Sequence, residues 1–290
     1  MKHTSLALAV LLAAGVCAEA RAGLFTDNFE MVVVANRAKD APADDAPGSC
    51  LLLNGGYIEA GDPIAGERPP APDDVLSAIK NAFVAQGFRL GGPSPAVAVS
   101  CFWGAIRVDH REARVPDAIY SNAKARIELV SSNQTGAELE NHILNNKSGA
   151  GENADASSPV ILAGPTRTTS QLARQPRYFV ILTAYDLASI APGKVPHELW
   201  QVKLSAQQTA GGMDEVIPAL VGSAGPYLGK RLPQAKIITT SLAAASARPA
   251  AATGAADHAP QGALLDAGAV SALLGRERVE YSGTTESSGG

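Results

Sequence analysis

The stretch AVAVSCFWGAIRV (residues 96–108) contains hardly any polar side chain and marks the centre of the expected sheet. A near-continuous apolar run of this length is typical of a strand that is covered on both faces. RYFVILTAYDL (177–187) has the same character, whereas ELWQVKLSAQ (198–207) alternates apolar with polar residues. The alternation predicts one buried and one solvent-facing side. We therefore expect 177–187 and 198–207 to form an antiparallel hairpin at or near the sheet edge.

Further elements are expected on either side of these strands. Residues 31–37 (MVVVANR) and 50–60 have the composition of strands. Apolar residues at helical spacing predict one helix at 74–86 and another at 213–228. Pro218 fits the second helix only if that helix starts late or bends at this residue.

These elements predict a single α+β domain over residues 23–240. Its core would be a mainly antiparallel sheet of four to six strands, packed by two or more helices that include 74–86 and 213–228. Residues 241–290 are dominated by alanine, glycine, serine and threonine. A segment of this composition cannot bury enough apolar surface to offset its conformational entropy. We expect it to be a low-complexity, mostly disordered C-terminal tail.

The N-terminus has the pattern of a signal peptide spanning residues 1–22. A basic start at Lys2 precedes an apolar run from Leu6 to Val16, and small residues end at Ala22. The alternative, a membrane anchor, is disfavoured because a span needs roughly 20 apolar residues. The sequence therefore predicts an exported protein of the periplasm or cell envelope that is soluble after cleavage, with no transmembrane segment in the mature chain.

The formal net charge of −4 over 290 residues excludes one class of partner. A nucleic-acid-binding surface needs a basic face that displaces counterions, and no basic cluster occurs in this chain. We expect the partner to be an unknown protein or a small-molecule ligand of the cell envelope. The motifs that bind phosphates or dinucleotides are missing as well, so no cofactor is predicted.

Two cysteines, Cys50 and Cys101, follow the expected cleavage site. In an oxidising compartment an even pair of cysteines can form a disulfide. Alternatively, each is a separate buried thiol, since Cys101 lies within an apolar run and a buried cysteine behaves as a small hydrophobe. The sequence leaves both readings open. The chain contains no C-x-x-C, and no metal site is predicted.

The segment GGYIEAGDPIAGERPP (55–70) holds the candidate binding residues Tyr57, Glu59, Asp62 and Glu67. One interpretation is structural: a strand ends here, and glycines and prolines turn the chain toward the next helix. The other is a surface that recognises a ligand or a partner. A calcium site is disfavoured, because the carboxylates lack the spacing of a calcium-binding loop.

The segment VDHRE (108–112) provides weak catalytic candidates, Asp109, His110 and Glu112, at the expected end of a strand. A histidine between two carboxylates can perform acid–base chemistry. A charged, solvated strand end is the alternative. The sequence does not decide whether the protein is an enzyme, although the lack of a recognised catalytic motif favours a binding role.

Several segments together resemble an uncharacterised family of exported bacterial proteins, a domain of unknown function. They are GGYIEAGDPIAGE, FWGAIRVDHRE, RYFVILTAYDL, LWQVKLSAQ and MDEVIPALVGSAGPYLG. The order of helix, apolar strand, hairpin and C-terminal helix is also loosely similar to small lipoprotein-like envelope domains. The lipid-acceptor cysteine of that group is missing, because Cys17 follows Val16 rather than a small residue. The resemblance implies a bacterial-envelope location and no catalytic residues.

The leading hypothesis is therefore an exported envelope protein of unknown function that binds a ligand or partner without catalysis. The alternative is an atypical periplasmic hydrolase. It would use Asp109, His110 and Glu112 together with a carboxylate from residues 59–67.

Overall fold

The computed structural model describes seven stretches of the chain: residues 28–42, 48–107, 124–131, 171–191, 194–208, 211–242 and 270–276. The strands are β1 (Asn28–Arg37), β2 (Ser49–Ala60), β3 (Arg89–Leu90), β4 (Val97–Ile106), β5 (Arg177–Asp186), β6 (Glu198–Gln207) and β7 (Lys236–Ser241). The principal helices are α2 (Pro72–Ala85) and α6 (Met213–Ala224), and the short 3₁₀ helices are η2 (Leu187–Ser189) and η4 (Gly225–Tyr227). Shorter helical segments occur at 124–130, 171–173 and 270–276.

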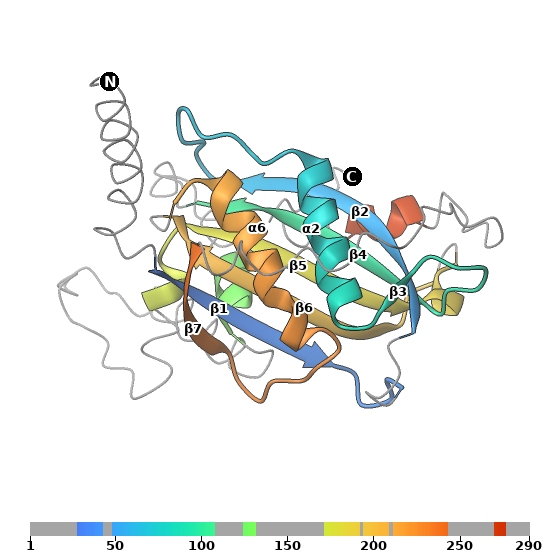
Figure 1. Ribbon diagram of the computed structural model, residues 1–290. Coiled ribbons are helices and arrows are strands. Elements are labelled where there is room, and N and C mark those ends of the chain that lie inside the picture. The colour runs from blue at the N-terminus through green and yellow to red at the C-terminus, as the bar shows by residue number, and fades with distance from the viewer. Residues whose placement is uncertain are drawn as a thin grey trace, which may run out of the picture.

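The strands form one seven-stranded mixed sheet in the order β3-β2-β4-β5-β6-β1-β7, shown in Figure 1. β2 pairs in parallel with both β3 and β4, and the remaining pairs are antiparallel. The expected mainly antiparallel sheet of four to six strands was therefore wrong. The difference arises at β2, where the chain crosses over through α2 and returns beside the same strand, as parallel neighbours require.

The antiparallel pairing of β5 with β6 is confirmed, with Arg177 opposite Gln207 and Leu182 opposite Val202. Its expected place at or near the sheet edge was wrong, since β5 and β6 are flanked by β4 on one side and by β1 and β7 on the other. The expected solvent-facing side of β6 was wrong too, because Gln201 and Lys203 are only 7% and 5% exposed. Polar alternation in β6 therefore marks a buried polar row rather than a wet surface.

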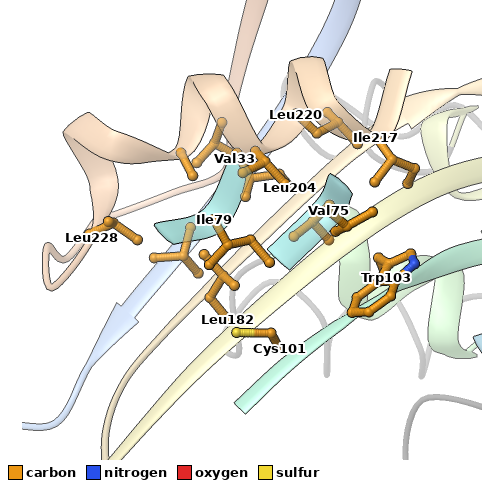
Figure 2. Packing of buried hydrophobic residues seen from close by; sticks show 14 of the residues in the cluster. Val33, Val75, Ile79, Cys101, Trp103, Leu182, Leu204, Ile217, Leu220 and Leu228 are labelled. Carbon is orange, nitrogen blue, oxygen red and sulfur yellow. The ribbon is translucent and has the colours of Figure 1, made fainter. Parts of the chain in front are cut away.

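One face of the sheet is covered by α2 and α6, which lie across the strands side by side (Figure 1). Figure 2 shows Ile79 of α2 and Leu220 of α6 packed in the same layer as Cys101 and Leu182 from the strands. Full burial of an aliphatic side chain stabilises the fold by roughly 1.5–3 kcal/mol. This layer is therefore a main source of stability.

The opposite face carries a second apolar cluster around Phe102, Phe179 and Ile181. The helical segment 124–130 contributes Leu129 to this cluster, and segment 270–276 packs Leu273 against a smaller cluster nearby. Coverage on both faces explains why β4 and β5 are apolar along nearly their whole length.

α2 and α6 begin without a side chain that caps their first turn. The N-cap of α2 is Ala71, and Pro72 occupies the first helical position, where a missing N–H costs nothing. Asp73 and Asp74 lie in the first turn of α2, where they interact favourably with the helix dipole. α6 begins at Met213 and contains Pro218 within it, so this helix does not start late.

β2 and β4 approach each other closely at Gly104. A Cβ atom at this position would lie 1.7 Å from the backbone oxygen of Ile58. β2 also carries an irregularity between Asn54 and Gly56, where its register with β4 shifts by one residue. Glycine at position 104 therefore allows the parallel pair to form.

Some expectations concern residues outside the described ranges. The predicted signal peptide (1–22) and most of the predicted disordered tail (241–290) belong to this group. In the portion that the structure describes, no helix is both long and apolar enough to cross a bilayer.

Candidate functional site

The candidate site is a cluster of five polar side chains at one end of the sheet: Tyr57, Glu59, Glu67, Arg107 and Tyr178, here called the Arg107 cluster. The strand register brings four of them together. Ala105 of β4 pairs with Glu59 on one side and with Tyr178 on the other. Arg107 lies just beyond the end of β4, and Tyr57 is two residues before Glu59 on the same face of β2.

Arg107 is held by two carboxylates. Its Nη1 donates to Glu59 Oε1, and its Nη2 donates to Glu67 Oε2. Tyr178 donates its hydroxyl proton to the other oxygen of Glu67. The side chains of Arg107 and Glu67 are 5% and 10% exposed, whereas that of Glu59 is 34% exposed. The cluster thus has a buried ion pair at its base and one carboxylate that reaches solvent.

The contacts change the proton affinity of two members. Burial alone would lower the pKa of Arg107, but hydrogen bonds and charge attraction from Glu59 and Glu67 outweigh it and raise that pKa. Burial, the charge of Glu59 and a hydrogen bond to Glu59 raise the pKa of Tyr57. Arg107 therefore stays protonated, and Tyr57 keeps its phenolic proton across the physiological range.

The other side of the same backbone is fixed by Arg126, which belongs to the helical segment 124–130 and is buried. Its Nη1 donates to the backbone oxygen of Arg107 at 2.9 Å, and its Nε donates to the backbone oxygen of Ala173 at 2.9 Å. The position of Arg107 is thus set both through its side chain and through its main chain.

The Arg107 cluster also anchors the segment 61–71, here called the pinned loop, which joins β2 to α2. Gly61 has a φ of 85°, and a Cβ there would lie 2.7 Å from the backbone oxygen of Arg107. Glu67 enters the cluster from the middle of this loop, and Pro70 is buried near its end. Between these attachments the loop exposes Ile64, whose exposed fraction is 49%.

Two buried N–H donors near the cluster, Trp103 Nε1 and Arg107 Nε, have no hydrogen-bond partner among the residues that the structure describes. Trp103 pairs with Tyr57 across β2 and β4, so both donors lie at the same end of the sheet. Figure 2 shows the indole nitrogen of Trp103 on the side of that ring away from the labelled Cys101. An unpaired buried donor costs about 1–3 kcal/mol.

The structure brings three of the four predicted binding residues together, namely Tyr57, Glu59 and Glu67. Asp62 is half-buried in the pinned loop. Sequence reasoning missed Arg107 and Tyr178. A signal existed for Arg107, because a charged residue directly after a strand that is covered on both faces needs an opposite charge nearby. Nothing in the pattern of β5 distinguished Tyr178 from its apolar neighbours.

The predicted catalytic residues Asp109, His110 and Glu112 lie outside the described residues. The hydrolase hypothesis therefore stays a prediction. That hypothesis also required a fourth catalytic residue, a carboxylate from residues 59–67. Both glutamates of that stretch are bound to Arg107.

Cys50 and Cys101 are buried thiols, and neither forms a disulfide within the described part of the chain. Cys50 pairs with Val97, and Cys101 pairs with Asn54, so the two cysteines lie four positions apart along adjacent strands. A disulfide needs Cα atoms about 4.4–6.8 Å apart, and each strand residue advances the chain by about 3.3 Å. The Cys50–Cys101 disulfide, one of the two alternatives that the sequence left open, therefore does not form in this register. Burial raises the pKa of the Cys50 thiol to about 12.

Comparison with known proteins adds little to this description. No family model matches the chain, and no curated protein matches it. Among solved structures, it is similar to the crystal structure of a PDZ domain protein from Parabacteroides distasonis, with 11% sequence identity and a TM-score of 0.35. The match covers 79% of this chain and 42% of that chain, so it spans less than half of the PDZ domain protein. Similarity at this level assigns neither a fold nor a function.

Proposed function

We propose that the protein is an exported, non-catalytic binding protein of the bacterial cell envelope and that it binds a partner protein through the pinned loop (61–71). The observation that carries the proposal is the anchoring of this loop. At the centre of the loop, Glu67 accepts hydrogen bonds from both Arg107 and Tyr178, while Ile64 is exposed to solvent.

A loop held in one conformation is suited to recognition, because little conformational entropy is lost when a partner binds. Here the loop is restrained by its prolines and by the two bonds to Glu67. The turn before Glu67 is closed by a backbone hydrogen bond from its N–H to Ile64 O at 3.2 Å. The exposed Ile64 would then be the apolar anchor of the interface, bordered by the charges of Asp62 and Arg68.

Export is the second part of the proposal and rests on the signal-peptide pattern of residues 1–22. The resemblance to uncharacterised exported bacterial proteins supports the same location. A partner would therefore be met in the periplasm or at the envelope.

Site-specific photocrosslinking in an exporting bacterial host tests the binding role. A photoreactive residue replaces Ile64 in one strain and Val195 in a control strain. Val195 is 78% exposed and lies on a different loop, so it reports non-specific capture. We expect irradiation to give an adduct of defined mass at position 64 and none at position 195.

A second strain combines the position-64 crosslinker with Glu67→Gln, which weakens the anchor but leaves the exposed surface unchanged. We expect the adduct yield to fall several-fold. Equal crosslinking at positions 64 and 195, or none at either, would contradict the proposed binding surface. An adduct whose yield is insensitive to Glu67→Gln would show that the anchor does not matter for recognition.

A further inference from the structure

The two edges of the sheet differ in how they are protected against pairing with another chain. Proteins usually shorten, charge or cover an edge strand, because it leaves a row of backbone N–H and C=O groups unpaired. The edge at β3 is only two residues long and carries the exposed Arg89. The edge at β7 is six residues long, without proline, and its one charged residue is Lys236 at the first position. Among the strands that the structure describes, β7 pairs with β1 alone (Figure 1).

The hydrogen bonds of β1 determine which residues of β7 direct their backbone groups outward. In an antiparallel pair, alternate residues bond to one neighbouring strand, and the residues between them point to the other side. The N–H of Ala38 donates to Leu199 O at 2.9 Å, so even-numbered residues of β1 bond to β6. The oxygen of Ala35 accepts from the N–H of Leu232 at 2.9 Å, on the other side of β1. Odd-numbered residues of β1 therefore bond to β7.

The outward-facing residues of β7 follow from this alternation. Met31 lies opposite Ile238, so Ile238 bonds inward to β1. Ile237 and Thr239 flank Ile238 and direct their N–H and C=O groups away from β1. Both residues are exposed, and the exposed fraction of Ile237 is 44%. The open edge thus offers two residues with outward backbone groups and an exposed β-branched side chain.

Lys236 does not protect the middle of this edge. It is the first residue of β7, and its side chain lies on the opposite face of the sheet from that of Ile237. Its Nζ lies 5.8 Å from the centre of the Tyr227 ring, in a cation–π contact within the same chain. The positive charge is therefore directed toward the surface of its own molecule.

We infer that β7 pairs antiparallel with β7 of a second copy of this chain, about a two-fold axis at Ile238, and that the two copies share one continuous sheet. In this register Ile237 lies opposite Thr239 of the second copy, and Thr239 lies opposite its Ile237. Each of these pairs exchanges two main-chain hydrogen bonds. Ile238 lies beside the same residue of the second copy, and a pair of β-branched side chains stabilises such a contact.

Charge and symmetry favour a second copy as the occupant of this edge. Antiparallel pairing keeps the two Lys236 residues apart by about 13 Å along the strands, whereas parallel pairing would place these like charges side by side. The uncharged centre of β7 is complementary to itself and offers no charge that would select a charged peptide. A two-fold contact also uses both β7 edges and leaves only the short β3 edges, so assembly stops at the dimer. The pinned loop follows β2, on the other side of the sheet, and the inference does not depend on its role.

Sedimentation velocity of the protein purified from an exporting host tests the dimer. An interface of one short strand from each copy is small, so we expect a dissociation constant on the order of 10–100 μM. The protein is measured from about 1 μM to about 300 μM, which spans this range. We expect the mass to rise from that of the monomer to that of the dimer and no further.

Two substitutions at the edge identify the contact. Ile237→Lys places a charge in the middle of the edge, and Thr239→Pro removes an outward N–H at a place where an edge strand tolerates proline. We expect each to weaken dimerisation at least tenfold, with an unchanged circular dichroism spectrum of the monomer. Val195→Lys is the matched control, because it makes the same change at an exposed apolar residue in the loop before β6. We expect this control to dimerise normally.

Oxidative crosslinking tests the register independently. Opposite residues of a non-hydrogen-bonded pair have Cα atoms about 4.5 Å apart, which is within the range of a disulfide. We expect Ile238→Cys to form a covalent dimer under a mild oxidant, and Val195→Cys and the unmodified protein to form far less.

Three results would overturn the inference. A monomer mass at every concentration would show that β7 does not pair with a second copy and leaves the edge to another chain or to solvent. A dimer that withstands both Ile237→Lys and Thr239→Pro would place the contact elsewhere. Equal weakening by Ile237→Lys and Val195→Lys would attribute the effect to net charge rather than to the edge of β7.

Discussion

The two glutamates that bind Arg107 contribute differently to stability. Glu67 is enclosed and accepts hydrogen bonds from both Arg107 and Tyr178, whereas about a third of the Glu59 side chain is open to solvent. An ion pair that reaches water is screened and contributes little, but removal of one partner from a buried pair leaves an uncompensated charge. Glu67 should therefore be the residue that holds the pinned loop in place.

Neutralising each glutamate in turn tests this difference. We expect Glu67→Gln to lower the free energy of unfolding by about 2 kcal/mol. The matched variant Glu59→Gln should lower it by less than about 1 kcal/mol. Urea denaturation of each variant measures the change, with unaltered m values as a check on two-state behaviour. Equal losses in the two variants would show that burial does not separate their roles.

The Cys50 thiol gives the protein a defined sensitivity to alkaline pH. Its pKa rises from an ordinary value of 9.0 to about 12 through burial. Between these values the unfolded chain binds fewer protons than the native state, so raising the pH favours unfolding. The contribution of the Cys50 thiol to the free energy of unfolding is therefore fully present below pH 9, and it is lost as the pH rises toward 12.

We expect the unmodified protein to lose about 1 kcal/mol more than Cys50→Ala between pH 8 and pH 10. The variant lacks the titrating thiol but retains every other ionisable group, so the difference isolates Cys50. Urea denaturation at several pH values provides the measurement. Parallel stability curves for the two proteins would refute the assignment.

The parallel contact between β2 and β4 depends on one glycine. Gly104 lies so close to the backbone of Ile58 that no side chain fits between the two strands. The backbone of a paired strand cannot move aside without breaking ladder hydrogen bonds. This position therefore restricts the sequence more strictly than its apolar surroundings suggest.

Gly104→Ala should destabilise the protein by more than about 3 kcal/mol or prevent folding. Gly48→Ala is the control, because a Cβ at position 48 meets nothing within 4 Å. Circular dichroism and thermal unfolding of both variants give the comparison. A folded Gly104→Ala protein of normal stability would mean that β2 and β4 are farther apart than described.

Local elements were predictable because each has its own periodicity, but their arrangement was not. The helices near 74–86 and 213–228 and the β5–β6 pairing followed from apolar spacing. The parallel pairing of β2 was missed, since it depends on the path of the chain through α2 rather than on any residue pattern. Gln201 and Lys203 were misread for a related reason: single-strand alternation does not reveal whether another layer covers the polar face.

Only the part of the candidate site that comes from residues 55–70 was predictable. Tyr57, Glu59 and Glu67 lie within one short segment, so their proximity was visible in the sequence. Tyr178 reaches them through pairing between β4 and β5, more than a hundred positions along the chain. Contacts of this kind require the strand order, which the sequence pattern left open.

Mass spectrometry of protein from an exporting host tests the predicted organisation of the full chain. We expect a mature protein that begins at Gly23, without attached lipid, because the signal-peptide pattern ends at Ala22. Its mass should be unchanged by a reductant, since Cys50 and Cys101 are not joined by a disulfide in the described part of the chain. A retained N-terminus would contradict cleavage, and a gain of two hydrogens after reduction would reveal a disulfide.

The position of β1 between β6 and β7 sets the order in which the fold can assemble. Its register joins Asn28 to Ser241, close to opposite ends of the described chain. The first strand therefore cannot pair until nearly the whole domain has been synthesised. Such distant pairing raises the contact order and slows folding. If the chain is exported as proposed, late closure of the sheet would leave it unfolded while it crosses the membrane.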